Sequence, residues 1–189
     1  MPSPDEMFII DPQQCMIKDF DTPGWILDIG GGGEGIIGRL KGSTVIAIDV
    51  RKEELDEAPP GPLKLVMDAT SLQFLDNTFD TVTAFFSFMY FPHESRAQVF
   101  QEVTRVLTSN GTFHIWDVTI PPVTDSTKNL FVVPLTIHLP HEQVQTAYGV
   151  PWHGRQQTLD DYLQLAQQTG LKPVSQQTTD HTFYITFTK

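Results

Sequence analysis

Three aspartates in this sequence stand where their carboxylates could bind a ligand. Each directly follows a short apolar run: Asp28 after 25–27, Asp49 after 45–48 and Asp68 after 63–67. If these runs are parallel strands, their carboxyl ends meet at the edge of the sheet where open α/β proteins bind ligands. Carboxylates accept hydrogen bonds from hydroxyl and amino groups and attract positive charge. We therefore expect a ligand that offers such groups.

A glycine-rich turn separates the first aspartate from a short apolar stretch. Asp28 is followed by glycines at 30–33 and 35, and residues 36–40 are typical of a short helix. Glycine lets the backbone adopt positive φ and lets a ligand approach without a Cβ in the way, while the first turn of a helix has unpaired N–H groups. This order of strand, turn and helix indicates a ligand-binding corner.

Two classes of nucleotide ligand use such a corner. The glycine spacing in 30–35, with Asp49 further along, matches the dinucleotide fingerprint and leaves an NAD-binding oxidoreductase as an alternative. However, the carboxylates of Asp28 and Glu34 would repel a pyrophosphate at this helix end. S-adenosylmethionine carries a sulfonium and an ammonium, so Asp28 would suit its amino-acid end and Asp49 its ribose hydroxyls.

Four segments, in order, carry a resemblance to a known family. They are 27–32 (LDIGGG), 45–50 (VIAIDV), 67–80 (MDATSLQFLDNTFD) and 103–113 (VTRVLTSNGTF). Together they resemble a class I S-adenosylmethionine-dependent methyltransferase over about 25–113. The resemblance implies S-adenosylmethionine as cofactor and an α/β fold, with a Rossmann-like seven-stranded, mostly parallel sheet, helices on both faces and a C-terminal antiparallel strand pair. Where the family usually has a third loop glycine, this chain has Glu34.

The same resemblance implies roles around the pocket. Asp68 would accept a hydrogen bond from the adenine amino group, Ala69 would offer its backbone N–H to the ring, and Val50 would lie against the adenine face. Two simpler interpretations stay open: Asp49 as the N-cap of a helix over 51–57, and Asp68 as an ordinary turn residue. The expected cofactor-binding residues are Asp28, Gly30, Gly32, Asp49, Val50, Asp68, Ala69 and Phe85.

The methyl acceptor should enter beside residues 87–92 (SFMYFP), which follow the fourth strand. Aromatic rings there could stabilise a sulfonium by cation–π attraction and exclude water, although some of them will only be core residues. In-line methyl transfer mainly needs alignment, so no catalytic residue is assigned. The side chains near the expected mouth that could act as a base are Tyr90, His93, His138, His141 and His153.

Several subclasses of methyltransferase do not fit. The Asn/Asp-Pro-Pro-aromatic signature of exocyclic-amine methylation is missing after the fourth strand, and the single Cys15 lies in the wrong segment for cytosine ring methylation. Arsenite methylation would need several cysteines. His138 and His141 have no third ligand at a recognisable spacing, so we expect no metal site. We expect a small organic acceptor, with a methyltransferase-like protein that binds the cofactor without turnover as the alternative.

Composition limits the partners further. The chain has 12 Lys and Arg against 23 Asp and Glu, a net charge of −11. Such a charge opposes binding to nucleic acid backbones and to anionic membrane surfaces. One cysteine cannot form an internal disulfide, and no pattern of a signal peptide or a spanning helix is present. We therefore expect a cytoplasmic protein with neither nucleic acid nor membrane as partner.

At 189 residues the chain has the length of one domain, and 1–189 is expected to form a single methyltransferase-like unit. Residues 1–24 are expected to be a flap or tail, with a short helix possible over 12–19. Residues 120–157 show no clear period and are expected to cover the substrate. The expected strands are 25–29, 45–48, 63–67, 79–86, 113–115, 172–177 and 181–188. The expected helices are 36–40, 51–57, 95–107 and 158–170.

Overall fold

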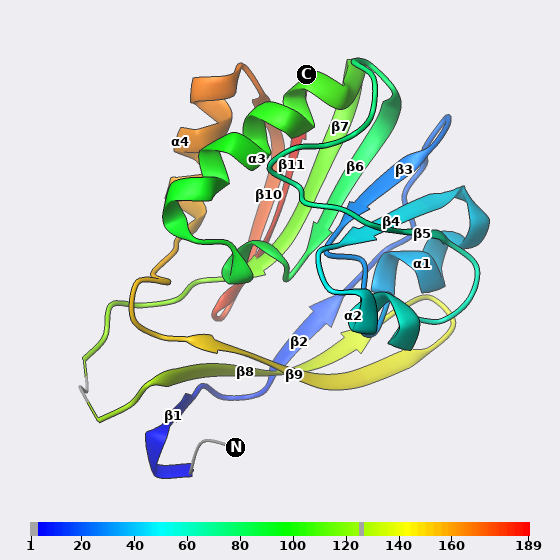
Figure 1. Cartoon of the computed structure of the whole chain (residues 1–189). Helices are drawn as coiled ribbons and strands as arrows, with labels where there is room; N and C mark the ends of the chain where they lie inside the picture. Colours follow the sequence, from blue (N-terminus) through cyan, green and yellow to red (C-terminus); the bar gives the residue numbers. More distant parts are fainter. Residues whose placement is uncertain (1–3, 125–126) are drawn as a thin grey trace.

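The computed structural model describes residues 4–124 and 127–189, which form two β-sheets and four α-helices (Figure 1). The strands are β1 (Met7–Ile9), β2 (Gln13–Met16), β3 (Ile26–Ile29), β4 (Val45–Asp49), β5 (Leu63–Val66), β6 (Phe79–Phe85), β7 (Leu107–Val118), β8 (Leu130–His138), β9 (Gln143–Pro151), β10 (Lys172–Thr179) and β11 (Thr182–Thr188). The helices are α1 (Ile36–Lys41), α2 (Lys52–Glu57), α3 (His93–Val106) and α4 (Leu159–Thr169).

The larger sheet has seven strands in the order β10-β11-β7-β6-β3-β4-β5. Strands β5, β4, β3, β6 and β7 are parallel, whereas β11 is antiparallel to β7 and β10 is antiparallel to β11. All four residues of β3 are buried, as expected for an apolar strand covered on both faces. The predicted seven-stranded, mostly parallel sheet with a C-terminal antiparallel pair is confirmed.

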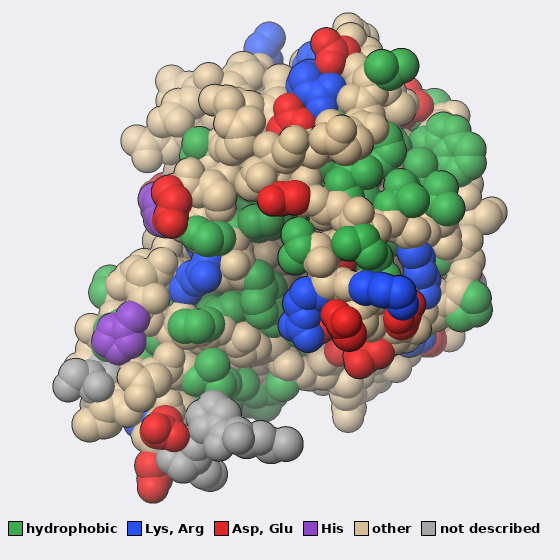
Figure 2. Space-filling model, viewed as in Figure 1, with side chains coloured by type: hydrophobic (Ala, Val, Ile, Leu, Met, Phe, Trp, Pro, Cys, Tyr) green, Lys and Arg blue, Asp and Glu red, His purple; other side chains and the backbone are tan. Residues whose placement is uncertain are grey.

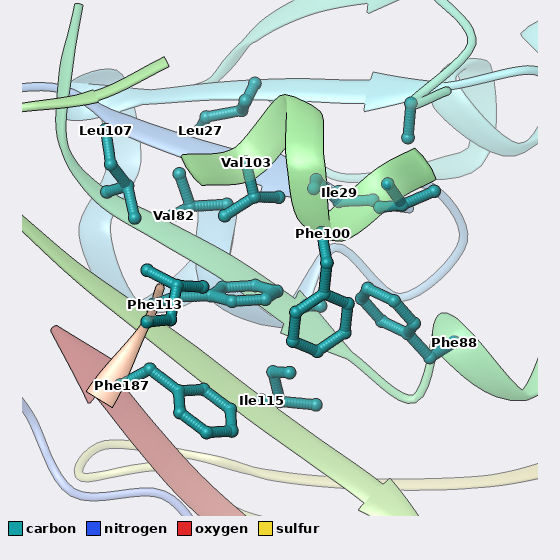
Figure 3. Packing of buried hydrophobic residues seen from close by; sticks show 14 of the residues in the cluster. Leu27, Ile29, Val82, Phe88, Phe100, Val103, Leu107, Phe113, Ile115 and Phe187 are labelled. Carbon is teal, nitrogen blue, oxygen red and sulfur yellow. The ribbon is translucent and has the colours of Figure 1, made fainter. Parts of the chain in front are cut away.

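Helices cover both faces of this sheet, also as predicted. On one face α3 and α4 pack against each other and against a cluster of aromatic rings that includes Phe100, Phe113 and Phe187 (Figure 3). On the other face α1 buries Ile36 and Ile37 in a second core cluster. Because alternate residues of a strand point to opposite faces, the strands β3, β4, β6, β7 and β11 supply side chains to both clusters.

The smaller sheet contains part of the N-terminal segment, and one prediction there is wrong. β1 and β2 follow one another along one edge of β8, while β9 pairs with the other edge. Residues 12–19 do not form a helix, because Gln13–Met16 is strand β2. Its burial alternates, with Gln13 and Cys15 facing inward, so the segment follows a period of two rather than a helical period.

Residues 120–157, in which the sequence showed no clear period, contain regular structure, and their expected role as a substrate cover stays a prediction. This segment contains the antiparallel pair β8 and β9, which are in register from Leu130 with Pro151 to His138 with Gln143. Every second residue of β8 is buried, but apolar side chains also occupy the alternate positions, such as Val132 and Pro134. Hydrophobicity alone therefore shows no alternation in this strand.

The smaller sheet packs beside the carboxyl ends of the parallel strands, where Figure 1 shows β8 and β9 as a long ribbon. Its inward side chains, among them Phe131, Val133 and Val150, belong to the same core cluster as Phe86 and Met89. This packing places β9 over the edge of the larger sheet that carries the three aspartates. None of the helices formed by the described residues is long and apolar enough to cross a membrane.

Candidate functional site

A cavity of about 920 Å³ lies at the carboxyl ends of β3, β4 and β6 and reaches the inner side of β9. Its wall is formed by the glycine turn, by the loops after β4, β5 and β6, and by part of β9. The structure brings all of the predicted cofactor-binding residues to this wall: Asp28, Gly30, Gly32, Asp49, Val50, Asp68, Ala69 and Phe85. Their role in binding a cofactor stays a prediction.

The glycine turn forms a cradle that side chains would fill. Gly30 has φ +70°, and a Cβ there would lie 2.5 Å from the Cβ of Ser87. A Cβ on Gly32 would lie 2.5 Å from the Cβ of Glu54. The backbone N–H groups of Gly30 and Gly31 donate to the carbonyl oxygen of Ile48, which fixes the turn against β4. Glycine is thus needed here both for conformation and for space.

Asp28 lies beneath the glycine turn and is almost fully buried. The Thr83 hydroxyl donates a hydrogen bond of 2.7 Å to its Oδ1. Burial raises the pKa of Asp28 to about 7; the Thr83 hydrogen bond opposes this shift and the negative charge of Asp49 adds to it. A carboxyl group that titrates near neutral pH in the wall of a cavity is typical of functional sites.

Asp49 and Asp68 each stabilise a turn and also face the cavity. Asp49 Oδ1 accepts a hydrogen bond of 2.9 Å from the backbone N–H of Arg51, and Asp68 Oδ1 accepts bonds of 2.8 Å from the backbone N–H and the hydroxyl of Thr70. The N-cap of α2 is Arg51, so Asp49 is not the N-cap residue. None of the three aspartates forms an ion pair with a described residue.

The apolar residues predicted to contact adenine occupy one part of the wall. Val50 is 60% exposed and lies on the cavity wall directly after β4. Ala69 is buried, and Phe85 packs its ring 4.9 Å from the ring of Phe86. Their contact with a nucleobase stays a prediction.

Ser87 is a wall residue that the sequence did not point to as a ligand contact. Its Oγ is buried and has no hydrogen-bond partner among the described residues. Buried hydroxyl groups are normally paired, so a polar ligand group in the cavity would satisfy this one. Together with the glycine turn and the three aspartates, which form no ion pair with a described residue, Ser87 fits a nucleoside cofactor with an amino-acid end. Its position directly after β6, at the same sheet edge as the aspartates, was the available signal.

Another part of the cavity wall is lined mainly by aromatic residues. Phe86, Tyr90, Phe91 and Tyr148 are on this wall, with Ala147 and Tyr148 coming from β9. Of the predicted aromatic stretch 87–92, Tyr90 and Phe91 therefore line the cavity, whereas Phe88 is fully buried in the core. Tyr148 was missed because the alternation within β9, in which Val144, Tyr148 and Val150 fall on one face, was not recognised as a strand pattern.

Among the candidate bases, Tyr90 lies on the cavity wall. Burial raises the pKa of Tyr90 to about 12 despite a hydrogen bond from the Gly149 backbone, and the negative charge of Glu34 adds to the shift. Its hydroxyl therefore stays protonated at neutral pH and is not suited to act as a base. The candidates that do not line the cavity are His93, His138, His141 and His153. His138 instead binds Gln14, with 2.7 Å between Nε2 and Oε1.

The wall is strongly acidic. Its carboxylates are Asp28, Glu34, Asp49, Glu54, Glu57 and Asp68, and Arg51 is the one basic residue on its described part. Arg51 pairs with Glu54 at 2.8 Å, and Figure 2 shows charged side chains gathered over α2 beside the cavity. This charge distribution favours a cationic ligand over a pyrophosphate. The described residues contain no cluster of three metal-ligating side chains.

Comparison with known proteins agrees with this architecture. Residues 27–115 match the family described as a methyltransferase domain. Similar solved structures include a protein of Pyrococcus horikoshii OT3, with 18% identity, a TM-score of 0.66 and coverage of 88% of this chain and 83% of the other. An S-adenosylmethionine-dependent methyltransferase of Methanosarcina mazei has 18% identity, a TM-score of 0.67 and coverage of 90% and 94%.

A third similar structure is an S-adenosylmethionine-dependent methyltransferase of Aquifex aeolicus, with 16% identity, a TM-score of 0.60 and coverage of 87% of this chain and 81% of the other. At such identities the likeness shows the fold. Among curated proteins, no sequence matches the chain significantly.

Proposed function

We propose that this chain methylates a small molecule by in-line transfer from S-adenosylmethionine, because residues 27–115 match a methyltransferase domain and the chain has the fold of class I S-adenosylmethionine-dependent methyltransferases. The observation that carries the proposal is a single cavity with two unlike walls, one lined by glycines and aspartates and the other by aromatic rings. About 920 Å³ lies at the upper end of the usual range for small-molecule sites, roughly 300–1,000 Å³. A cofactor and a small acceptor can share such a space.

The acidic wall would hold the cofactor. Asp49 offers Oδ2 to the ribose hydroxyls while its Oδ1 keeps the turn in place, and Asp68 offers Oδ2 to the adenine amino group in the same way. The glycine turn leaves room for close approach of the amino-acid end, and Ser87 supplies a hydroxyl without a partner. Asp28 contributes negative charge from beneath the turn.

The aromatic wall would align the acceptor. S-adenosylmethionine supplies a methyl group activated by positively charged sulfur, so the transfer depends on alignment more than on acid–base chemistry. Tyr90, Phe91 and Tyr148 exclude water from this part of the cavity and restrict the orientation of a flat acceptor. A small acceptor in a cytoplasmic setting is also what the net charge of −11 and the single cysteine favour.

Transfer of labelled methyl groups tests this proposal. The protein is incubated with methyl-labelled S-adenosylmethionine and a metabolite extract, and the label is followed in the small-molecule and macromolecular fractions. We expect label in new small molecules for the wild type and much less for Asp49→Ala. Label confined to protein or nucleic acid would contradict the proposal, as would tight binding of S-adenosylhomocysteine without any turnover or preferential binding of NAD.

A further inference from the structure

Glu34, the residue that departs from the usual glycine motif, connects the glycine turn with strand β9. The hydroxyl of Thr146 donates to its Oε1 and the hydroxyl of Tyr148 donates to its Oε2 at 2.8 Å. Arg39 of α1 donates to the Glu34 backbone oxygen at 2.6 Å and pairs through its guanidinium with Glu142 at 3.0 Å. Two hydroxyl donors therefore hold this carboxylate at the wall of the cavity.

The negative charge of Glu34 is not neutralised by the described part of the protein. Its carboxylate forms no ion pair there, because Arg39 pairs with Glu142 and Arg51 pairs with Glu54. Each carboxylate oxygen has two lone-pair sites, so each can accept one more hydrogen bond. A half-buried carboxylate without a cation is costly, and a cationic group in the cavity would compensate it.

The Glu34 carboxylate and the predicted cofactor acids lie on different sides of the glycine turn. A Cβ on Gly32 would lie 2.5 Å from the Cβ of Glu54 and 3.1 Å from Oδ2 of Asp49, so this side of the turn faces α2 and β4. Glu34 reaches the other way, to Thr146 and Tyr148 on β9. It therefore faces the part of the cavity expected to hold the acceptor.

Aromatic rings surround this carboxylate. The ring of Tyr148 lies 5.6 Å from that of Phe86, and Tyr90 and Phe91 continue the same wall. Burial raises the pKa of both tyrosines, so their rings stay neutral. Faces of neutral aromatic rings attract cations, and a carboxylate among them adds a charged acceptor.

The unpaired hydroxyl of Ser87, placed above beside the amino-acid end of the cofactor, also indicates that this cavity takes a polar ligand. Ser87 is only 7% exposed and lines the same cavity as Glu34 and Tyr148. Its oxygen can accept a hydrogen bond from an N–H donor of a ligand.

We propose that Glu34 is a specificity residue that selects methyl acceptors carrying a protonated amine on an aromatic or similarly flat apolar body. The amine binds the Glu34 carboxylate, and the apolar body packs against the rings of Phe86, Tyr90 and Tyr148. Acceptors with a carboxylate or phosphate in this place are repelled, because the described wall offers no free cation. This inference rests on the proposed function, since it assigns the acceptor class of the same cavity.

Binding of matched small probes to the protein saturated with S-adenosylhomocysteine tests the proposal. Phenethylamine, phenethyl alcohol and hydrocinnamate share one aromatic body and differ in carrying a cationic, a neutral or an anionic group. We expect the amine to bind roughly tenfold tighter than the alcohol, and the carboxylate most weakly. In Glu34→Gln, which keeps the shape and one acceptor oxygen but removes the charge, the amine and the alcohol should bind within about twofold of each other.

A matched control is Glu142→Gln, which removes the same charge from the β8–β9 hairpin outside the cavity wall and should keep the preference for the amine. The proposal is overturned if no probe binds, if the wild type shows no preference, or if Glu34→Gln keeps it. It is also overturned if Glu34→Gln weakens S-adenosylhomocysteine binding tenfold, because Glu34 would then serve the cofactor. Failure of the proposed function looks different, since the wild type would then either not bind S-adenosylhomocysteine or transfer no labelled methyl group to any small molecule.

Discussion

The hydroxyl of Tyr148 donates a hydrogen bond of 2.8 Å to Oε2 of Glu34, joining residues that are 114 positions apart in the sequence. One of them belongs to the glycine turn of the larger sheet and the other to β9 of the smaller sheet. The contact joins the two sheets at the wall of one cavity, because both the glycine turn and β9 line that cavity.

A double-mutant cycle of Glu34→Gln and Tyr148→Phe measures this contact. We expect a coupling of about 0.5–1 kcal/mol in the free energy of unfolding, the lower part of the range for residues in contact, because the pair is half-buried. Urea denaturation of the wild type, the two single variants and the double variant gives the value. Effects that add within about 0.3 kcal/mol would show that the hydrogen bond does not form in solution.

Asp49 is expected to hold the ribose, so Asp49→Ala should weaken S-adenosylmethionine binding by more than about 1 kcal/mol, the scale of a hydrogen bond to a charged group. Asp56→Ala removes the same charge from an exposed position on α2, where Asp56 pairs with Lys52, and should leave the affinity unchanged. Isothermal titration measures both. An unaltered dissociation constant in Asp49→Ala would place the ribose elsewhere.

Gly30 is expected to be irreplaceable in the turn. Gly30→Ala combines an unfavourable positive φ with a Cβ only 2.5 Å from the Cβ of Ser87, so it should lose most S-adenosylhomocysteine binding. Gly154→Ala is the matched control, because Gly154 has φ +73° and nothing within 4 Å of an added Cβ. It should cost about 1 kcal/mol of stability from backbone strain and leave binding intact. If both variants bind S-adenosylhomocysteine equally well, the turn does not need glycine at position 30 for binding.

The buried carboxyl of Asp28 predicts a pH dependence of stability. Its pKa is raised from an ordinary value near 4 to about 7, so between these values the folded state binds more protons than the unfolded state. Its contribution to stability is therefore present below pH 4 and is lost as the pH rises towards 7. Asp117, whose pKa is raised to about 6 by burial, has the same sign.

Asp28→Asn should accordingly reduce, but not abolish, the loss of stability of the ligand-free protein between pH 5 and pH 8. Urea denaturation at both values measures it, with the exposed Asp56→Asn as control. If Asp28→Asn and the wild type lose stability equally over this range, Asp28 does not carry a raised pKa.

Much of the larger sheet could be predicted because its signals are local. Strands β3, β4 and β5 are short apolar runs with an acid at or near the carboxyl end, whereas only 113–115 of the longer β7 was predicted. The capping box from Thr158 to Asp161 and the terminal Gly170 mark α4 as the sequence indicates. The predicted site residues meet at one cavity because parallel strands bring their carboxyl ends together.

The smaller sheet could not be predicted, because its pairing is not local. β2 is a strand only because β8, more than a hundred residues later, offers an edge from Leu135 to His138. β8 in turn carries apolar residues on both faces, which removes the alternation that would have indicated a strand. With β9 unrecognised, neither Tyr148 nor the direction of the Glu34 side chain could be foreseen from the sequence.

A crystal structure of the protein with S-adenosylhomocysteine tests most directly whether the acidic wall is the cofactor site. We expect the ribose hydroxyls at Asp49, the adenine between Val50 and the Asp68–Ala69 turn, the amino-acid end along the glycine turn, and empty space beside Glu34 and Tyr148. A ligand bound outside this cavity, or one lying with its ribose away from Asp49, would contradict the assignment of the site.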